Sequence, residues 1–408
     1  MKISRRSLIA TSAAASVLPA LRARAQNQNQ TIKLGVLTDL SGPYSDVGGK
    51  VSTACAQLAA DDFGASGKGI NVQVIQADHQ NKPDVGTSIA RQWFDNQGVD
   101  VILDVPNSGV GLAVAGIAKE KNKVYINTGS ATSDLTGPNC TPNTVHWSYD
   151  TYMLAKSTGG SIVKSGGTSW YFVTANYTFG QILERQTTEF IKAAGGKVLG
   201  SNTYPFPGTT DFSSQLVAAQ SSGAKVLGLA SAGADTINQV KQAHEFGLQM
   251  TIAGLLVFIS DVHAMSLEDA QGLRVTSSFY WDLNDRTRAF SKRLEPKAPN
   301  VRATMVQAGV YAGALHYLKA ATEMGVAQAK KDGAATVAQM KKMPFDDDCF
   351  GTGKIREDGV ALVNAYLFEV KKPSESKGPW DYYRQIAMTP ADQAFMPLNQ
   401  TQCSLVKA

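Results

Sequence analysis

The alternation of apolar and polar positions divides the first half of the chain into short strands and amphipathic helices. Runs of apolar and β-branched residues predict buried strands at residues 32–37, 70–77, 99–105 and 123–128. Between these runs, apolar residues recur every three to four positions, which predicts helices at residues 49–63, 83–97 and 110–122. Strands that alternate with helices in this way predict a parallel sheet covered by helices on both faces.

The same alternation restarts after residue 148. Further strands are predicted at residues 169–174, 197–204, 226–230 and 251–256, with helices between them. Helical patterns return at 287–293 and 305–325, before a strand-rich tail at 344–370. A chain of 408 residues is longer than one hydrophobic core usually supports. We therefore predict an α/β fold of two doubly wound parallel-sheet lobes joined by a multi-crossing hinge, with lobe one at 31–148 plus 282–345 and lobe two at 149–281 plus 346–400.

The N-terminal segment has the pattern of an export signal. Basic residues near the start are followed by an apolar run at 8–18 and by Ala23-Arg24-Ala25, an A-x-A cleavage pattern. The apolar run is shorter than a membrane span requires. We predict that residues 1–25 are a signal peptide, of the twin-arginine type because of the pair Arg5-Arg6, and that the mature protein is periplasmic.

Removal of this segment changes the charge of the protein. The formal net charge of +5 equals the number of basic residues in the segment, which are Lys2, Arg5, Arg6, Arg22 and Arg24. The mature chain is therefore near neutral, and it has no Lys/Arg cluster of the kind that binds nucleic acid. We expect no nucleic-acid partner.

Four cysteines in an exported chain allow three fully paired connectivities. Cys55 lies in the helical pattern at 51–63, where a buried free thiol is expected. We favour a disulfide between Cys140 and Cys403.

Five segments together resemble one protein family. They are TDLSGPYSDVG at 38–48, AADDF at 59–63, SATSDLT at 130–136, YTFG at 177–180 and GTTDF at 208–212. In this order they resemble the type I periplasmic binding proteins of the leucine/isoleucine/valine-binding kind. The resemblance implies a monomeric solute-binding receptor of an ABC uptake transporter, which closes two lobes around a small ligand and docks on an inner-membrane permease.

Polar residues follow two of the predicted lobe-one strands. In an open parallel sheet, ligands bind beyond the carboxyl ends of the strands, where helix N-termini present free N–H groups. The candidate residues for holding a carboxylate there are Asn107, Ser108, Ser130, Ala131 and Thr132. The hydroxyls of Ser108 and Thr132 suit helix caps equally well.

Aromatic residues complete the candidate site. The resemblance places Tyr44, Tyr152 and Tyr177 where they close over the ligand, and Phe258 and Tyr280 could extend an apolar wall. Ordinary packing in the core or hinge is the alternative for each of them.

The residues after the predicted strand 251–256 bear on the ligand. Amino-acid binders of this family carry an acidic residue there that pairs with the ammonium group, whereas this chain has Val257-Phe258-Ile259-Ser260, with Asp261 as the nearest carboxylate. An ammonium group without a counter-charge in a dry cleft costs several kcal/mol. The segment 276–284 (TSSFYWDLN) is also similar to the subgroup that binds aromatic carboxylates. We favour an aromatic carboxylate ligand, with a branched-chain or other hydrophobic amino acid, or a periplasmic sensor subunit, as alternatives.

Enzyme motifs are incomplete in this sequence. A dinucleotide fingerprint would begin at Gly109-Val-Gly111, but Val114 occupies the position of its next glycine. The chain contains no G-x-S-x-G, H-E-x-x-H or C-x-x-C motif, and its five histidines are scattered. We expect no catalytic activity, no cofactor and no metal site.

Overall fold

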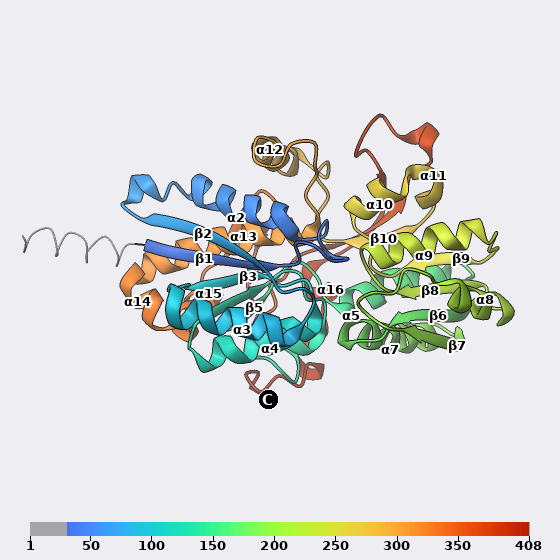
Figure 1. Ribbon diagram of the computed structural model, residues 1–408, viewed down its shortest axis with the longest axis horizontal. Helices are drawn as coiled ribbons and strands as arrows, with labels where there is room; N and C mark the ends of the chain where they lie inside the picture. The colour runs from blue at the N-terminus through green and yellow to red at the C-terminus, as the bar shows by residue number, and fades with distance from the viewer. Residues whose placement is uncertain (1–30, 408) are drawn as a thin grey trace, which may run out of the picture.

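The computed structural model describes residues 31–407, so the predicted signal peptide at 1–25 lies outside the described residues. Two α/β lobes lie side by side, with the chain crossing between them (Figure 1). Within the described part of the chain, no helix is both long and apolar enough to cross a membrane.

Lobe one is built on a parallel sheet with the strand order β2-β1-β3-β4-β5. Its strands are β1 (Thr31–Thr38), β2 (Asn71–Asp78), β3 (Val101–Asp104), β4 (Val124–Asn127) and β5 (Thr144–His146). Successive side chains of a strand point to opposite faces. In β3, for example, Val101 and Leu103 pack into one hydrophobic core while Ile102 packs into another.

Helices cover both faces of this sheet, as predicted. On one face α2 (Gly49–Phe63) packs against α13 (Met305–Met324), and on the other α3 (Pro83–Gln92) packs against α4 (Ser108–Glu120) (Figure 1). The remaining helices near this lobe are α12 (Asp285–Leu294), α14 (Val326–Lys331) and α15 (Gly333–Lys342).

Lobe two repeats the arrangement with a parallel sheet in the order β7-β6-β8-β9. Its strands are β6 (Ser169–Ala175), β7 (Lys197–Tyr204), β8 (Val226–Ala230) and β9 (Thr251–Gly254). Its helices are α5 (Thr151–Leu154), α6 (Gly160–Lys164), α7 (Thr178–Ala193), α8 (Ser213–Ser221), α9 (Ala234–Glu245), α10 (Ile259–Met265) and α11 (Leu267–Ala270). The predicted α/β fold class is confirmed.

A smaller antiparallel sheet adds a feature that the sequence pattern did not predict. It consists of β10 (Arg274–Ser277), β13 (Ala365–Val370) and β14 (Tyr383–Thr389), in that order. Most residues of the edge strand β14 are exposed, so it lacks the apolar alternation that marks a strand.

The chain after α15 returns to lobe-one residues before it reaches β13. The hairpin of β11 (Phe345–Asp347) and β12 (Gly351–Gly353) lies close to lobe one, because the Phe345 ring lies 4.9 Å from that of Trp147. Val360 then forms a parallel bridge with His146 at the end of β5. The predicted boundaries assign residues 346–400 to lobe two and do not include this return to lobe one. They stay a prediction.

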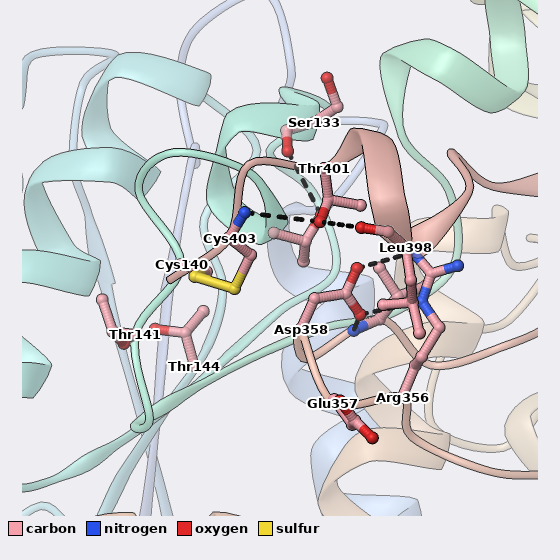
Figure 2. Close-up of a disulfide and its surroundings, with 12 residues drawn as sticks. Ser133, Cys140, Thr141, Thr144, Arg356, Glu357, Asp358, Leu398, Thr401 and Cys403 are labelled. Carbon is pink, nitrogen blue, oxygen red and sulfur yellow. Dashed lines mark hydrogen bonds and ion pairs between the residues drawn. A yellow bond between two sulfur atoms is a disulfide. The ribbon is translucent and has the colours of Figure 1, made fainter. Parts of the chain in front are cut away.

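The C-terminal tail is joined covalently to lobe one. After β14 and α16 (Ala391–Ala394), the tail ends beside the loop that follows Gly137, where Cys403 forms a disulfide with Cys140 (Figure 2). The Cys403 N–H donates to Thr401 Oγ1, which itself donates to the Leu398 carbonyl. The favoured pairing is confirmed, and Cys55 and Cys349 are buried thiols.

Candidate ligand-binding site

A cavity of about 10 Å³ lies between the two lobes. It is lined by Tyr44, Val47, Pro106, Ser108, Gly129, Ala131, Tyr149, Tyr177, Phe179, Ala232, Leu256 and Phe258. Most of these residues closely follow the carboxyl end of a parallel strand, namely β1, β3 and β4 in lobe one and β6, β8 and β9 in lobe two. This is where open α/β sheets bind ligands.

The predicted polar residues of lobe one form a single hydrogen-bonded group of loops. Asn107 caps α4, since its Oδ1 accepts the Val110 N–H at 3.1 Å. The Ser108 hydroxyl accepts the Thr132 N–H at 3.2 Å, and Thr132 Oγ1 accepts the Asp134 N–H at 3.2 Å. Thr132 therefore caps the short 3-10 helix that follows it.

Ser130 ties the second loop to the first. Its hydroxyl lies 2.5 Å from the Val105 carbonyl oxygen and 2.9 Å from that of Asn107, so its proton is donated between them. Of the five predicted polar-loop residues, Ser108 and Ala131 line the cavity. The other three, Asn107, Ser130 and Thr132, hold the loops in position and are not among the lining residues.

Aromatic side chains connect the lobes across the cavity. The hydroxyl oxygens of Tyr44, in lobe one, and Tyr177, in lobe two, lie 2.5 Å apart. The Phe206 ring stacks on both, with centroids 4.4 Å from Tyr177 and 5.4 Å from Tyr44. Beside them, the Pro43 carbonyl accepts the N–H of Ala234, at the start of α9, at 3.1 Å.

Two of the predicted aromatic residues lie away from the cavity. The Tyr152 ring packs edge-on against Phe190, with the Lys156 ammonium 5.9 Å from its centroid. Tyr280 belongs to the lobe-two core, where its ring lies 5.1 Å from that of Tyr383. Their contact with a ligand stays a prediction.

The lining also contains residues that were not singled out from the sequence. Tyr149 is the most informative, because its O–H donates to the Gly129 carbonyl at 2.8 Å and its ring meets Phe258 edge-on. Phe179, Ala232 and Leu256 complete the lobe-two wall. The available signal was their position just after β6, β8 and β9, at the carboxyl edge of the sheet.

The charge pattern of the lining is simple: among the described residues that line this cavity, none carries a charged side chain. Asp261, the carboxylate nearest in sequence to the predicted ammonium position, is buried in the first turn of α10. Its Oδ2 accepts the Phe258 N–H at 2.9 Å, so it caps the helix. Burial raises the pKa of Asp261 to about 7.

A second buried carboxyl lies in lobe two, behind the aromatic pair. Asp235, in the first turn of α9, accepts the Tyr204 O–H at 2.8 Å, and burial raises its pKa to about 6. Residues 31–407 contain no group of three or more His, Cys, Asp or Glu side chains arranged to hold a metal ion.

Comparison with known proteins gives both family and structural matches. A family model described as periplasmic binding protein matches residues 31–378. The crystal structure of a periplasmic binding protein from Burkholderia mallei is 45% identical, with a TM-score of 0.88, and the match covers 93% of this chain and 100% of that one. No match was found among curated protein sequences.

Two further structures differ in what their names say of the ligand. A branched chain amino acid ABC transporter periplasmic ligand-binding protein from Burkholderia xenovorans LB400 is 38% identical, with a TM-score of 0.80 and coverage of 92% of this chain and 99% of that one. An ABC transporter solute binding protein from R. palustris, in complex with benzoate, is 22% identical, with a TM-score of 0.80 and coverage of 92% and 100%. At 22% identity, the second match bears on the fold alone.

Proposed function

Because the chain belongs to the periplasmic binding protein family, we propose that it is the solute-binding receptor of an ABC uptake transporter and that it holds a small carboxylate between its two lobes. The family is one of binding proteins, which agrees with the expectation that the chain is not an enzyme. A periplasmic location and an inner-membrane permease as partner follow from the same membership.

The carboxylate group is assigned to the lobe-one loops. Ser108 lines the cavity and is the first residue of α4, so the positive end of the helix dipole lies at the cavity wall. Helix N-termini of this kind bind anions through their N–H groups. The Ser108 hydroxyl, which accepts the Thr132 N–H, has a proton that it can donate to the ligand.

The body of the ligand is assigned to the aromatic and aliphatic side chains opposite. Tyr149, Tyr177, Phe179, Leu256 and Phe258 form a wall that suits a ring. An ammonium group in this cavity would meet no carboxylate among the lining residues, and leaving it unpaired costs several kcal/mol. The uncharged lining is the observation that carries the proposal of an aromatic carboxylate.

Ligand entry requires the lobes to separate. A cavity of about 10 Å³ approaches only the volume that one water molecule needs. An aromatic acid therefore enters when the Tyr44–Tyr177 contact opens, and the lobes close again around it. Closure removes water from the site, which strengthens each polar contact to the carboxylate.

A hydrophobic amino acid is the second candidate ligand. The Burkholderia xenovorans protein, at 38% identity, is named as a branched-chain amino acid transporter component. In that case Asp261 would have to turn from the Phe258 N–H toward the ammonium group and lose its cap.

Small-angle X-ray scattering of the mature protein tests the receptor mechanism. We expect an aromatic acid such as benzoate to alter the radius of gyration and maximum dimension in a saturable way, as the ligand selects one closed arrangement of the lobes. Leucine and acetate serve as comparison ligands. A saturable response to leucine with none to aromatic acids would reject the aromatic assignment, and no response to any carboxylate would reject the proposed function.

A further inference from the structure

Asp104, the last residue of β3, is a buried carboxylate that the ligand contacts described above leave unused. Its side chain is fully buried, and neither carboxylate oxygen forms a well-aligned hydrogen bond among the described residues. The hydroxyls of Ser52, Thr38 and Thr128 nevertheless lie close enough to stabilise its charge. Buried polar groups are normally hydrogen-bonded, so an exception at a ligand site points to a function. Burial raises the pKa of Asp104 to about 6, against the opposing effect of the nearby hydroxyls of Ser52, Thr38 and Thr128.

The backbone at this position is strained. Asp104 has a φ of +79°, and the next residue, Val105, has a φ of +64°. This left-handed conformation is rare for a β-branched residue such as valine. The Asp104 carbonyl accepts the N–H groups of Thr128 and Gly129 at 3.2 and 3.3 Å. These hydrogen bonds from the loop after β4 hold the strained conformation in place, and residues of the same loop line the cavity. Backbone strain of this kind concentrates at functional sites.

A glycine that lines the cavity lies next to the Asp104 carboxylate. A Cβ atom on Gly129, which lines the cavity, would lie 2.9 Å from Asp104 Oδ1. On the other side, a Cβ atom on Gly48 would lie 2.6 Å from Asp104 Oδ2, and its neighbour Val47 also lines the cavity. The two glycines bring the carboxylate close behind the wall at which the ligand's own carboxylate is assigned.

The groups around Asp104 provide no positive charge. Asp39, which directly follows β1, is a second carboxylate. Burial raises the pKa of three further neighbours, so they are neutral near pH 7: Cys55 of α2, Tyr125 of β4 and Tyr149. Among the ion pairs of residues 31–407, none involves Asp104. An anion that enters the cavity therefore adds to a negative charge that no ion pair offsets.

We propose that Asp104 is the proton acceptor that couples capture of an anionic ligand to pH: an Asp104 carboxylate oxygen takes up one proton from solvent as a carboxylate enters the cavity. This inference rests on the proposed carboxylate ligand. Two like charges held close together in a water-poor site cannot both stay ionised, so the ligand's charge favours the protonated form of Asp104. The protonated carboxyl can then donate to the Thr38, Ser52 or Thr128 hydroxyl.

The sign of the coupling follows from linkage. In the ligand-free protein burial raises the pKa of Asp104 to about 6. The proposal requires that this pKa is higher in the complex. Between these two pKa values the complex holds more protons than the free protein, so affinity rises as pH falls. The rise is at most about tenfold per pH unit for one proton, and it ends below about pH 6, where both states are protonated.

Calorimetric titration of the wild-type protein with benzoate near pH 7, in two buffers of different ionisation enthalpy, measures the protons taken up on binding. We expect net uptake of up to one proton per benzoate bound and an affinity that increases toward pH 6. In Asp104→Asn we expect benzoate to bind with no proton uptake and with little pH dependence. Asp235→Asn and Asp261→Asn are the matched controls, because both remove a buried carboxyl of raised pKa in lobe two.

Each outcome separates the coupling from the proposed function. Benzoate that binds the wild type without proton uptake would overturn the coupling and leave the receptor function standing. Uptake that disappears in Asp235→Asn or Asp261→Asn would overturn the assignment to Asp104, and this holds even if Asp104→Asn fails to fold. Failure of benzoate and other aromatic acids to bind at all would overturn both.

Discussion

The hydroxyl oxygens of Tyr44 and Tyr177 lie 2.5 Å apart across the boundary between the lobes, and Phe206 stacks on both rings. Tyr44 follows β1 of lobe one, whereas Tyr177 directly precedes α7 of lobe two. The same two side chains also line the cavity. We therefore expect hinge closure and ligand contact to depend on this one pair of residues.

Removal of one hydroxyl should favour the open arrangement. In Tyr177→Phe the interlobe hydrogen bond is lost, at a cost of about 0.5–1.5 kcal/mol, while the stacking on Phe206 remains. We expect the ligand-free variant to have a larger radius of gyration than the wild type in small-angle scattering. Tyr152→Phe is the control, since that ring packs on Phe190 away from the cavity. Equal radii of gyration for the wild type and Tyr177→Phe would contradict the prediction that the Tyr44–Tyr177 hydrogen bond helps to hold the lobes together.

Substitutions of Ser108 and Thr132 should distinguish a residue that contacts the ligand from one that caps a helix. Ser108 lines the cavity, so Ser108→Ala is expected to weaken binding of an aromatic acid by about 1–3 kcal/mol, as measured by calorimetry. Thr132 Oγ1 accepts the Asp134 N–H, so Thr132→Ala is expected to lower the free energy of unfolding by about 1 kcal/mol, with affinity changed by no more than a few-fold. If Thr132→Ala weakened binding and Ser108→Ala lowered only the stability, Thr132 would be the ligand contact and Ser108 the cap.

The regular parts of the fold were predictable because their patterns are local. The buried strand expected at 99–105 is β3, and the helix expected at 49–63 is α2, because apolar side chains must alternate or recur wherever a strand or helix meets a core. The edge strand β14 was missed because most of it is exposed. No local pattern shows that Val360 returns to pair with His146, since that bridge joins residues far apart in the sequence.

The candidate site was predictable where it follows a strand and less so elsewhere. Ser108 and Tyr177 come just after β3 and β6 and do line the cavity. In the crossover, Tyr149 and Tyr152 look alike in sequence. Ser148, with a φ of +75°, and the extended Asp150 reorient the chain between β5 and α5, so that Tyr149 reaches the cavity while Tyr152 packs on α7.

The disulfide should contribute strongly to stability. The Cys140–Cys403 bond closes a loop with a sequence separation of 263, and loss of a native disulfide typically costs about 2–5 kcal/mol. We expect the double variant Cys140→Ser, Cys403→Ser to unfold at lower urea concentration than the wild type. A reducing agent should lower the stability of the wild type and leave that of the double variant unchanged. If the reducing agent lowered the stability of both proteins equally, its effect would not come from the Cys140–Cys403 disulfide.

The buried carboxyl of Asp261 should make stability depend on pH. Its pKa is raised by burial from 3.8 to about 7, so between these values the folded protein binds more protons than the unfolded chain. The free energy of unfolding of the wild type relative to Asp261→Asn should then fall as pH rises through this window, by up to about 1.4 kcal/mol per pH unit. Urea denaturation of both proteins at several pH values measures the difference. A difference that is constant with pH, or that grows in the opposite direction, would contradict the burial argument.

The most direct test of the proposed function is a calorimetric titration of the mature wild-type protein with benzoate and, separately, with leucine. The uncharged cavity lining predicts saturable one-to-one binding of benzoate and at least about tenfold weaker binding of leucine, because no lining residue offers a carboxylate that can contact the leucine ammonium group directly. Tight binding of leucine together with no binding of benzoate would contradict the aromatic carboxylate assignment.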